Sequence, residues 1–287
     1  MSRMIDRLLD TGCVCVDELS QRDIIHRLGR AVVFDITNVA EYVRDECGRG
    51  HRQWSQTEFP CLAPPYEDYW MEFAVRPCGD PAAARRAGAL VLAEEYPVGN
   101  GSTPLVEGAR WHTWALLLFE LRDGRFFAGP GHEEYLDRSG VCMQRFIRRP
   151  AHWDSELCRQ AVDEVFLPIS LATTFLHCRN VVVEEKSPSI RRSRAHEERT
   201  GRPLVTFKTL QLEPVQRLLS EEGKREEVGL KVALHICRGH FKDYRERGLF
   251  GKRHGIYWWG QALRGHAEQG VVLKDYAVKG PARAAIG

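Results

Sequence analysis

Two strand-like stretches joined by an Asp-Gly turn constrain the fold of this chain more than any other local feature. Apolar and aromatic residues dominate 111–121, and Phe126-Phe127-Ala128 follows directly after the turn at Asp123-Gly124. Asp-Gly favours a tight β-hairpin because both positions tolerate a positive φ. The hairpin predicts an antiparallel sheet in the first two thirds of the chain, to which strands expected at 70–75 and 89–96 would belong.

Helix signals surround these strands. A helix is expected at 16–30, before a β-branched strand at 31–36, and Thr37 is a suitable N-cap for a further helix. The broadest apolar helix spans 154–178, where Pro168 should kink or divide it. Helices that flank an antiparallel sheet pack onto its faces, so the fold class predicted is α+β.

Charge is distributed unevenly along the chain. Residues 186–287 contain 21 Lys and Arg against 11 Asp and Glu, a net charge of +10, whereas the whole chain carries +2. The stretch 186–203 is rich in charge and has the composition of an exposed arm. We therefore expect an acidic α+β domain at 1–185, a basic linker or arm at 186–203, and a small basic β-rich module at 204–287. Clustered cations attract phosphate backbones, which predicts that the module meets nucleic acid or another polyanion.

Cationic and aromatic residues alternate through the basic module. The run HICRGHFKDY at 235–244 ends an expected strand, and IYWW at 256–259 follows it closely. Single-stranded nucleic acid binds to such surfaces because cations contact its backbone and aromatic rings stack on its bases. The residues predicted to bind nucleic acid are Lys242, Arg264, Trp258, Trp259, Arg191, Arg192 and Arg194.

The same run contains the groups that a metal-independent ribonuclease needs. Two histidines supply a general base and a general acid near neutral pH, and an arginine stabilises the charge of the phosphorane. Strand alternation separates His235 from Arg238 and His240, unless Gly239 bulges the strand. The candidate catalytic residues are His240, Arg238, His235 and Tyr244.

Other interpretations remain open. The same basic face would serve a non-enzymatic DNA- or RNA-binding regulator, or an interaction protein that targets an acidic host protein. Arg191 and His196 match the Arg-x4-His spacing of a group of helical ribonucleases, but this short match is interpreted as chance within a basic arm. A His and an Arg at the end of a strand also commonly bind loop carbonyl groups without any chemistry.

The C-terminal pattern resembles uncharacterised hypothetical proteins of phages, plasmids and integrated bacterial elements. The shared form is His-x-x-Arg-Gly-His-aromatic, then Leu249-Phe250-Gly251, a tryptophan and Arg264-Gly265. Two upstream pieces, at 63–73 and 175–180, are also similar to such proteins. The resemblance implies a mobile-element setting and a special role for the residues from His235 to His240, and it implies no particular activity.

The cysteines and the missing motifs limit the other function classes. Nine cysteines at irregular spacings, without a CxxC, favour reduced thiols and a cytoplasmic location. No secretory signal or membrane segment is expected, and no cofactor, because Walker, GxSxG, HExxH and GxGxxG motifs are absent. His177-Cys178 is interpreted as a packing and capping pair at a helix end. Zinc binding by Cys13, Cys15, Cys47 and His51, the one metal site considered, is left open.

Overall fold

The structure, a computed structural model, describes most of the chain. The described residues are 3–11, 21–48, 59–75, 86–96, 106–121, 123–148, 165–212, 233–237, 239–249, 251–260, 262–264 and 266–271. At 46–48, 233–237, 262–264 and 266–271 only the backbone is described.

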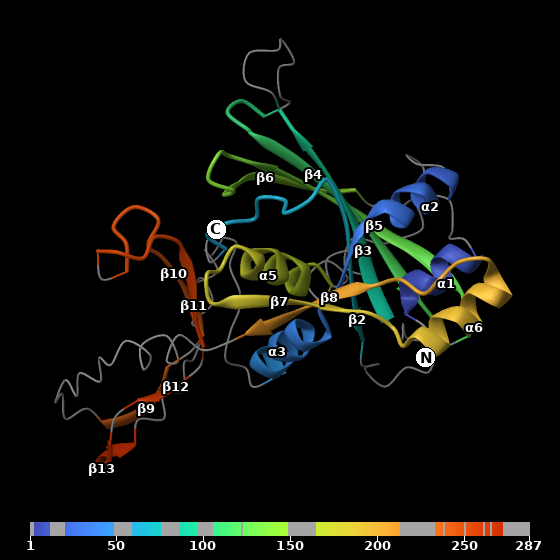
Figure 1. The fold of residues 1–287 in the computed structure, drawn as a ribbon. Helices are drawn as coiled ribbons and strands as arrows, with labels where there is room; N and C mark the ends of the chain where they lie inside the picture. Colours follow the sequence, from blue (N-terminus) through green and yellow to red (C-terminus); the bar gives the residue numbers. More distant parts are fainter. Residues whose placement is uncertain are drawn as a thin grey trace, which may run out of the picture.

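An eight-stranded sheet forms the centre of the fold (Figure 1), with the strand order β6-β5-β4-β3-β2-β1-β8-β7. Its strands are β1 Val32–Asp35, β2 Asp68–Ala74, β3 Arg86–Glu95, β4 Trp111–Glu120, β5 Phe126–Leu136, β6 Cys142–Arg148, β7 Val181–Lys186 and β8 Phe207–Leu212. Adjacent strands are antiparallel except at β1, which is parallel to both β2 and β8. The sheet is therefore mixed, because the helix that follows β1 carries the chain back before β2 begins.

The hairpin predicted from the Asp-Gly turn is confirmed. The strands β4 and β5 pair with Glu120 opposite Phe126, and Gly124 has a φ of 84°. The Gly124 amide donates to the Leu121 carbonyl at 3.0 Å, which closes the turn. The local signal thus set the register between β4 and β5.

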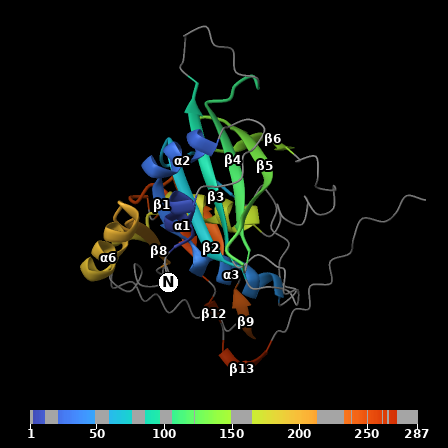
Figure 2. The same cartoon turned by 90° about the vertical axis from the view of Figure 1, so that its right-hand side faces the viewer.

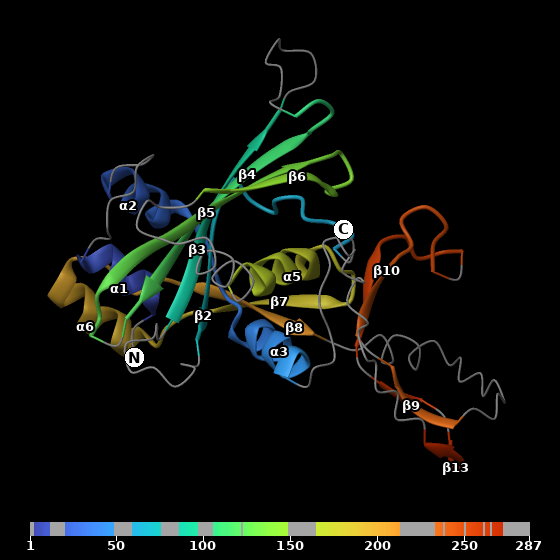
Figure 3. The ribbon, with the colours of Figure 1, turned by 180° about the vertical axis from the view of Figure 1, so that it is seen from behind.

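Helices cover both faces of the sheet (Figures 1 and 3), which confirms the α+β class. On one face, α3 (Thr37–Gly48) and α5 (Leu167–Leu176) form a core with side chains such as Met71 and Leu117. On the other face, α1 (Met4–Thr11) and α2 (Gln21–Arg30) pack on side chains such as Trp70 and Leu116. Neighbouring residues of one strand thus enter different cores, because successive side chains point to opposite faces.

Pro168 lies in the first turn of α5, directly after a short π-helical stretch at 165–166. Proline fits the first turn of a helix because its missing N–H would have no helical partner there. The expected helix continued upstream to residue 154, and that portion lies outside the described residues. Within 165–178, the expected central core helix is confirmed, since seven residues from Ile169 to Phe175 are buried.

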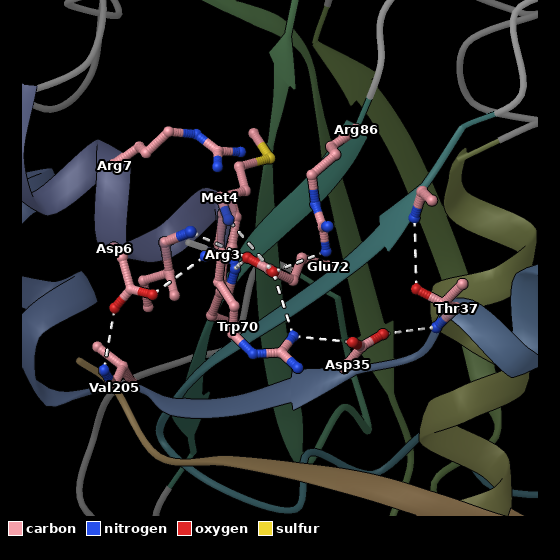
Figure 4. Close-up of polar contacts among 12 residues, drawn as sticks. Arg3, Met4, Asp6, Arg7, Asp35, Thr37, Trp70, Glu72, Arg86 and Val205 are labelled. Carbon is pink, nitrogen blue, oxygen red and sulfur yellow. Dashed lines mark hydrogen bonds and ion pairs between the residues drawn. The ribbon is translucent and has the colours of Figure 1, made fainter. Parts of the chain in front are cut away.

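A buried carboxylate fastens α1 to the sheet (Figure 4). Glu72 of β2 accepts hydrogen bonds from the amides of Met4 and Ile5 at 3.3 and 2.9 Å, and from the Trp70 indole at 2.9 Å. The guanidinium of Arg86 lies 2.9 Å from it, and that of Arg3, at 3.4 Å, is shared with Asp35. Because its oxygens are occupied by these donors, we interpret Glu72 as a structural residue.

The expected linker at 186–203 is folded, which corrects the domain boundaries drawn from charge. The stretch contains α6 (Ile190–Thr200), and Figure 2 shows α6 beside α1. Arg202 forms an ion pair with Asp10, and the Val205 amide donates to Asp6 at 2.9 Å. Beyond it, β8 pairs with both β1 and β7, so the main sheet continues into the region that was assigned to a separate module.

The remaining strands form two small sheets. The strands β10 (His240–Asp243) and β11 (Ile256–Trp259) make an antiparallel ribbon, and β9 (Ala233–Cys237) lies between β12 (Ala262–Arg264) and β13 (His266–Val271). The ribbon packs on α5, where Phe175 contacts the rings of Phe241 and Trp258 with centroids 5.4 and 5.0 Å apart. None of the described helices is long and apolar enough to cross a membrane.

Candidate functional site

The ribbon brings three of the predicted residues together. His240 and Lys242 of β10 share one face with Trp259 of β11, which pairs with His240. The rings of His240 and Trp259 are nearly parallel with centroids 6.4 Å apart, and the Lys242 Nζ lies 4.4 Å from the Trp259 ring centroid. This partly exposed face carries a cation, an imidazole and an indole.

Two other predicted residues of this region are less accessible: Trp258 lies in the main core, and Tyr244 packs in a small cluster with Tyr257 and Trp259. Trp258 is only 3% exposed and belongs to the core, so its indole ring is not accessible to a base. Tyr244 is half-buried, and its ring contacts that of Tyr257 with centroids 6.0 Å apart. Burial raises the pKa of the Tyr244 phenol, which makes it a weaker acid.

The rest of the predicted set is dispersed. Arg191, Arg192 and Arg194 are exposed on α6, at the opposite end of the molecule from the ribbon (Figures 1 and 3). His235 pairs with Arg264 between β9 and β12, in a different sheet from His240. Arg238 lies outside the described residues.

The possible zinc ligands also fall outside the described side chains, since Cys13, Cys15 and His51 are not described and only the backbone of Cys47 is. Among the described parts of the chain, no three His, Cys, Asp or Glu residues are grouped so that they could hold a metal ion.

A pocket of about 510 Å³ lies elsewhere, at the end of α5. It is formed by the segment that precedes β2, by the residues that follow α5, and by the loop and strand edge of the β10–β11 ribbon. Its lining residues are Cys61, Leu176, His177, Cys178, Arg179, Arg245, Gly255 and Ile256. A cavity of this size suits a small molecule, and a thiol and an imidazole face it together.

Cys61 and His177 shift each other's pKa in opposite directions. Burial raises the pKa of the Cys61 thiol, but the hydrogen bond and charge of His177, the Ala63 amide and the Arg245 charge together hold it below its ordinary value. Burial lowers the pKa of His177, whereas Cys61 and the Ala63 carbonyl raise it to a net value above the ordinary one. Both shifts favour a thiolate beside an imidazolium.

The peptide groups of Ala63 hold both members of this pair. The Ala63 amide stabilises the thiolate, and the His177 Nε2 lies 2.7 Å from the Ala63 carbonyl oxygen. Because a carbonyl oxygen only accepts, Nε2 carries a hydrogen, which leaves Nδ1 as the nitrogen that gains and loses a proton. The imidazole is thus held in one orientation and one neutral tautomer.

The loop between β5 and β6 packs closely against the Cys61 thiol. Gly140 has a φ of 81°, and its carbonyl accepts a hydrogen bond from the Leu62 amide at 2.7 Å. A Cβ at Gly140 would lie 2.6 Å from the Cys61 Sγ and 2.8 Å from the Ala63 nitrogen. The Asp137 carboxylate holds this loop by accepting from the Ser139 and Val141 amides at 2.8 and 3.0 Å.

Arg245 joins the ribbon to the other walls of the pocket. Its guanidinium donates to the Ser139 carbonyl at 2.9 Å, to the Pro60 carbonyl at 3.2 Å, and to Asp243 at 2.6 Å. With these bonds made, Arg245 acts on Cys61 mainly through its charge, which helps to lower the pKa of the thiol.

The other free cysteines with described side chains differ from Cys61. Burial raises the pKa of Cys142 to about 11, and it also raises the pKa of Cys178 in the same pocket. Of these three described thiols, Cys61 is therefore the one whose pKa the protein environment lowers.

Sequence reasoning gave Cys61 no role and assigned His177 to helix-end packing and capping. The two residues lie far apart in the chain, and a Cys–His pair of this kind has no local spacing by which it can be found. Of the two upstream pieces noted in the sequence, 63–73 begins two residues after Cys61 and 175–180 contains His177, and the two meet where His177 contacts the Ala63 carbonyl. Comparison of the chain with protein-family models and with curated proteins gives no match.

Proposed function

We propose that this protein is a cysteine-dependent enzyme that transfers or hydrolyses an acyl group in the pocket of Cys61 and His177. The observation that carries the proposal is the thiol–imidazole pair at the wall of a preformed cavity, with the pKa of the thiol lowered and that of the imidazole raised. A lowered pKa increases the fraction of the cysteine that is thiolate near neutral pH, and the thiolate is the nucleophilic form.

Cys61 and His177 supply the nucleophile and the proton transfers that this reaction needs. The Cys61 thiolate attacks the carbonyl carbon of an acyl compound, and the bond to the leaving group breaks as that group takes the proton from the His177 imidazolium. The neutral imidazole then accepts a proton from water, or from a second nucleophile, as this attacks the thioester. The acyl product leaves, and the thiolate and imidazolium are restored.

Alkylation tests the thiol activation on which the proposal depends. Iodoacetamide labelling across a pH series, with the modified cysteines identified by peptide mass spectrometry, should modify Cys61 at lower pH than Cys142 or Cys178. His177→Asn should raise the pH midpoint of Cys61 labelling by about one to two units, the size of one hydrogen bond to a charged group. Labelling of Cys61 no earlier than Cys178, or an unchanged midpoint in His177→Asn, would show that the pair is not activated.

We also propose a second candidate function, the binding of RNA or single-stranded DNA, for which the shared face of His240, Lys242 and Trp259 is the supporting observation. Lys242→Gln should weaken binding to end-labelled oligonucleotides, and Trp259→Ala should weaken it further. Cleavage in EDTA that His240→Ala abolishes would identify a metal-independent ribonuclease. Retarded but intact nucleic acid would indicate a binding module, and the absence of both at low salt would redirect the search to a protein partner.

A further inference from the structure

Arg179 is fixed at the wall of the pocket by its backbone. It follows His177 and Cys178 directly, and its amide donates to the Ile256 carbonyl at 2.9 Å. Cys178 forms a parallel bridge with Ile256, so this part of the chain is bound to the start of β11. The base of the Arg179 side chain is therefore held at a constant place relative to Cys61 and His177.

The side chain of Arg179 lies across the backbone of Gly255. A Cβ at Gly255 would lie 2.7 Å from the Arg179 Cγ and 3.1 Å from its Nε, so the contact requires glycine. Gly255 also has a φ of 142°, which other residues rarely adopt. The glycine thus provides the surface on which the arginine stem rests.

The guanidinium of Arg179 is exposed, and no hydrogen bond or ion pair joins it to any described residue. Arg245, the other arginine of the pocket, is occupied by Asp243 and by two carbonyl groups. Among the described residues, the donors of Arg179 are thus unoccupied, and a planar guanidinium binds the oxygens of a carboxylate or phosphate in pairs.

We infer that the substrate of Cys61 carries an oxyanion, a carboxylate or a phosphate, that Arg179 binds while the reactive carbon lies at the thiolate. This inference rests on the proposed thiol chemistry, because it assigns the substrate class of the same pocket. A charged group held at one end of a small molecule would orient the other end toward the sulfur. The Arg179 side chain would then act as a substrate-binding residue.

A pair of alkylating reagents separates charge from thiol reactivity. Iodoacetate carries a carboxylate where iodoacetamide carries a neutral amide, so the ratio of their rates at Cys61 cancels any change in the pKa of the thiol. Arg179→Gln should lower the iodoacetate rate about fivefold, the scale of a partly exposed ion pair, and leave the iodoacetamide rate nearly unchanged. Arg179→Lys should retain part of the effect, and Arg191→Gln on distant α6 should change neither rate.

The outcomes distinguish failure of the inference from failure of the proposed function. Rapid labelling of Cys61 by iodoacetamide, with a rate ratio unaffected by Arg179→Gln, would overturn the role of Arg179 and leave the thiol chemistry intact. Slow labelling of Cys61 by the neutral reagent would overturn both. Equal slowing of both reagents in Arg179→Gln would show that Arg179 shapes the pocket without binding an anion.

Protection of Cys61 from alkylation by small anions identifies the kind of anion that Arg179 binds. Protection of Cys61 by acetate in preference to inorganic phosphate would indicate a carboxylate-bearing substrate, and the reverse preference would indicate a phosphate-bearing one. Either protection should disappear in Arg179→Gln, and protection that persists in that variant would contradict the assignment.

Discussion

At the scale of residues, one peptide segment prepares the thiol for chemistry. Ala63 stabilises the Cys61 thiolate through its amide and holds the His177 ring through its carbonyl. The adjacent prolines Pro64 and Pro65 restrict the backbone of this segment. A short stretch of main chain thus fixes both reactive groups, and no third side chain is required to orient the imidazole.

Gly140→Ala should disturb this arrangement, and Gly124→Ala is its matched control. Both glycines have a φ above 80°, but an added Cβ contacts the thiol only at Gly140 and meets nothing within 4 Å at Gly124. The control should lose about 1 kcal/mol of unfolding free energy from the backbone alone. Gly140→Ala should lose about 3 kcal/mol and shift the pH profile of Cys61 labelling. Equal destabilisation in urea, with unchanged labelling, would contradict the close packing.

The residues of the pocket could not be predicted from the sequence. Neither the charge pattern nor the strand periodicity around Cys61 signals its contact with His177, because the contact depends on how α5 meets the segment before β2. His240 and Lys242 were predicted from local composition, and they do share a face with Trp259. Trp258 entered the core instead, as the alternation of side chains along β11 requires.

At the scale of elements, local sequence signals predicted where strands and helices occur better than they predicted which strands pair. The Asp-Gly turn and the apolar runs predicted β2, β3, β4 and β5 in place. The parallel pairing of β1 and the insertion of β8 beside it were not foreseen, because sequence periodicity carries no information on which strands become neighbours. The charged stretch interpreted as a linker contains α6, and Arg202, just after this helix, forms an ion pair with Asp10 of α1.

The attachment of α1 depends on Glu72. Glu72→Gln should destabilise the protein by about 3 kcal/mol, because the guanidinium groups of Arg86 and Arg3 lose their buried carboxylate partner. Urea denaturation measures the change. Asp123→Asn, which removes an exposed ion pair with Arg125, should cause no measurable change. A Glu72→Gln midpoint equal to that of the control would contradict the structural role of this carboxylate.

At the scale of the whole molecule, the elements around the Cys61 pocket and the helices that pack on the other face of the sheet lie in different regions. The β10–β11 ribbon lies on one side of the molecule, whereas α1, α2 and α6 lie on the opposite side (Figure 1). The pocket is lined by residues at the end of α5 and by residues of the ribbon. The three-layer arrangement follows from strands that are apolar on both faces. The net charge of the last third suggested a separate module, but it includes α6 and β8 of the main body, so charge alone did not identify the boundary.

Acid stability is a property of the whole molecule that one buried histidine should influence. His132 is 1% exposed, neither ring nitrogen has a partner among the described residues, and burial with the Arg145 charge holds its pKa well below the ordinary value. The unfolded chain binds a proton below about pH 6.5 and the folded chain does not, so stability falls as the pH decreases below that value. His132→Leu should reduce this loss by up to about 1.4 kcal/mol per pH unit. If the urea midpoints of the unaltered protein and of His132→Leu fell equally with decreasing pH, this effect of His132 would be contradicted.

The Cys61 thiol should ionise at a lower pH than an ordinary thiol, because its pKa is lowered beside His177, and this ionisation can be measured directly. Ultraviolet absorbance of the thiolate, titrated in the protein and in Cys61→Ser, gives a difference curve that belongs to this one residue. A midpoint clearly below the ordinary thiol value of about 8.5, which moves upward in His177→Asn, is the predicted result. A midpoint at or above that value, unaffected by His177→Asn, would show that His177 does not activate Cys61.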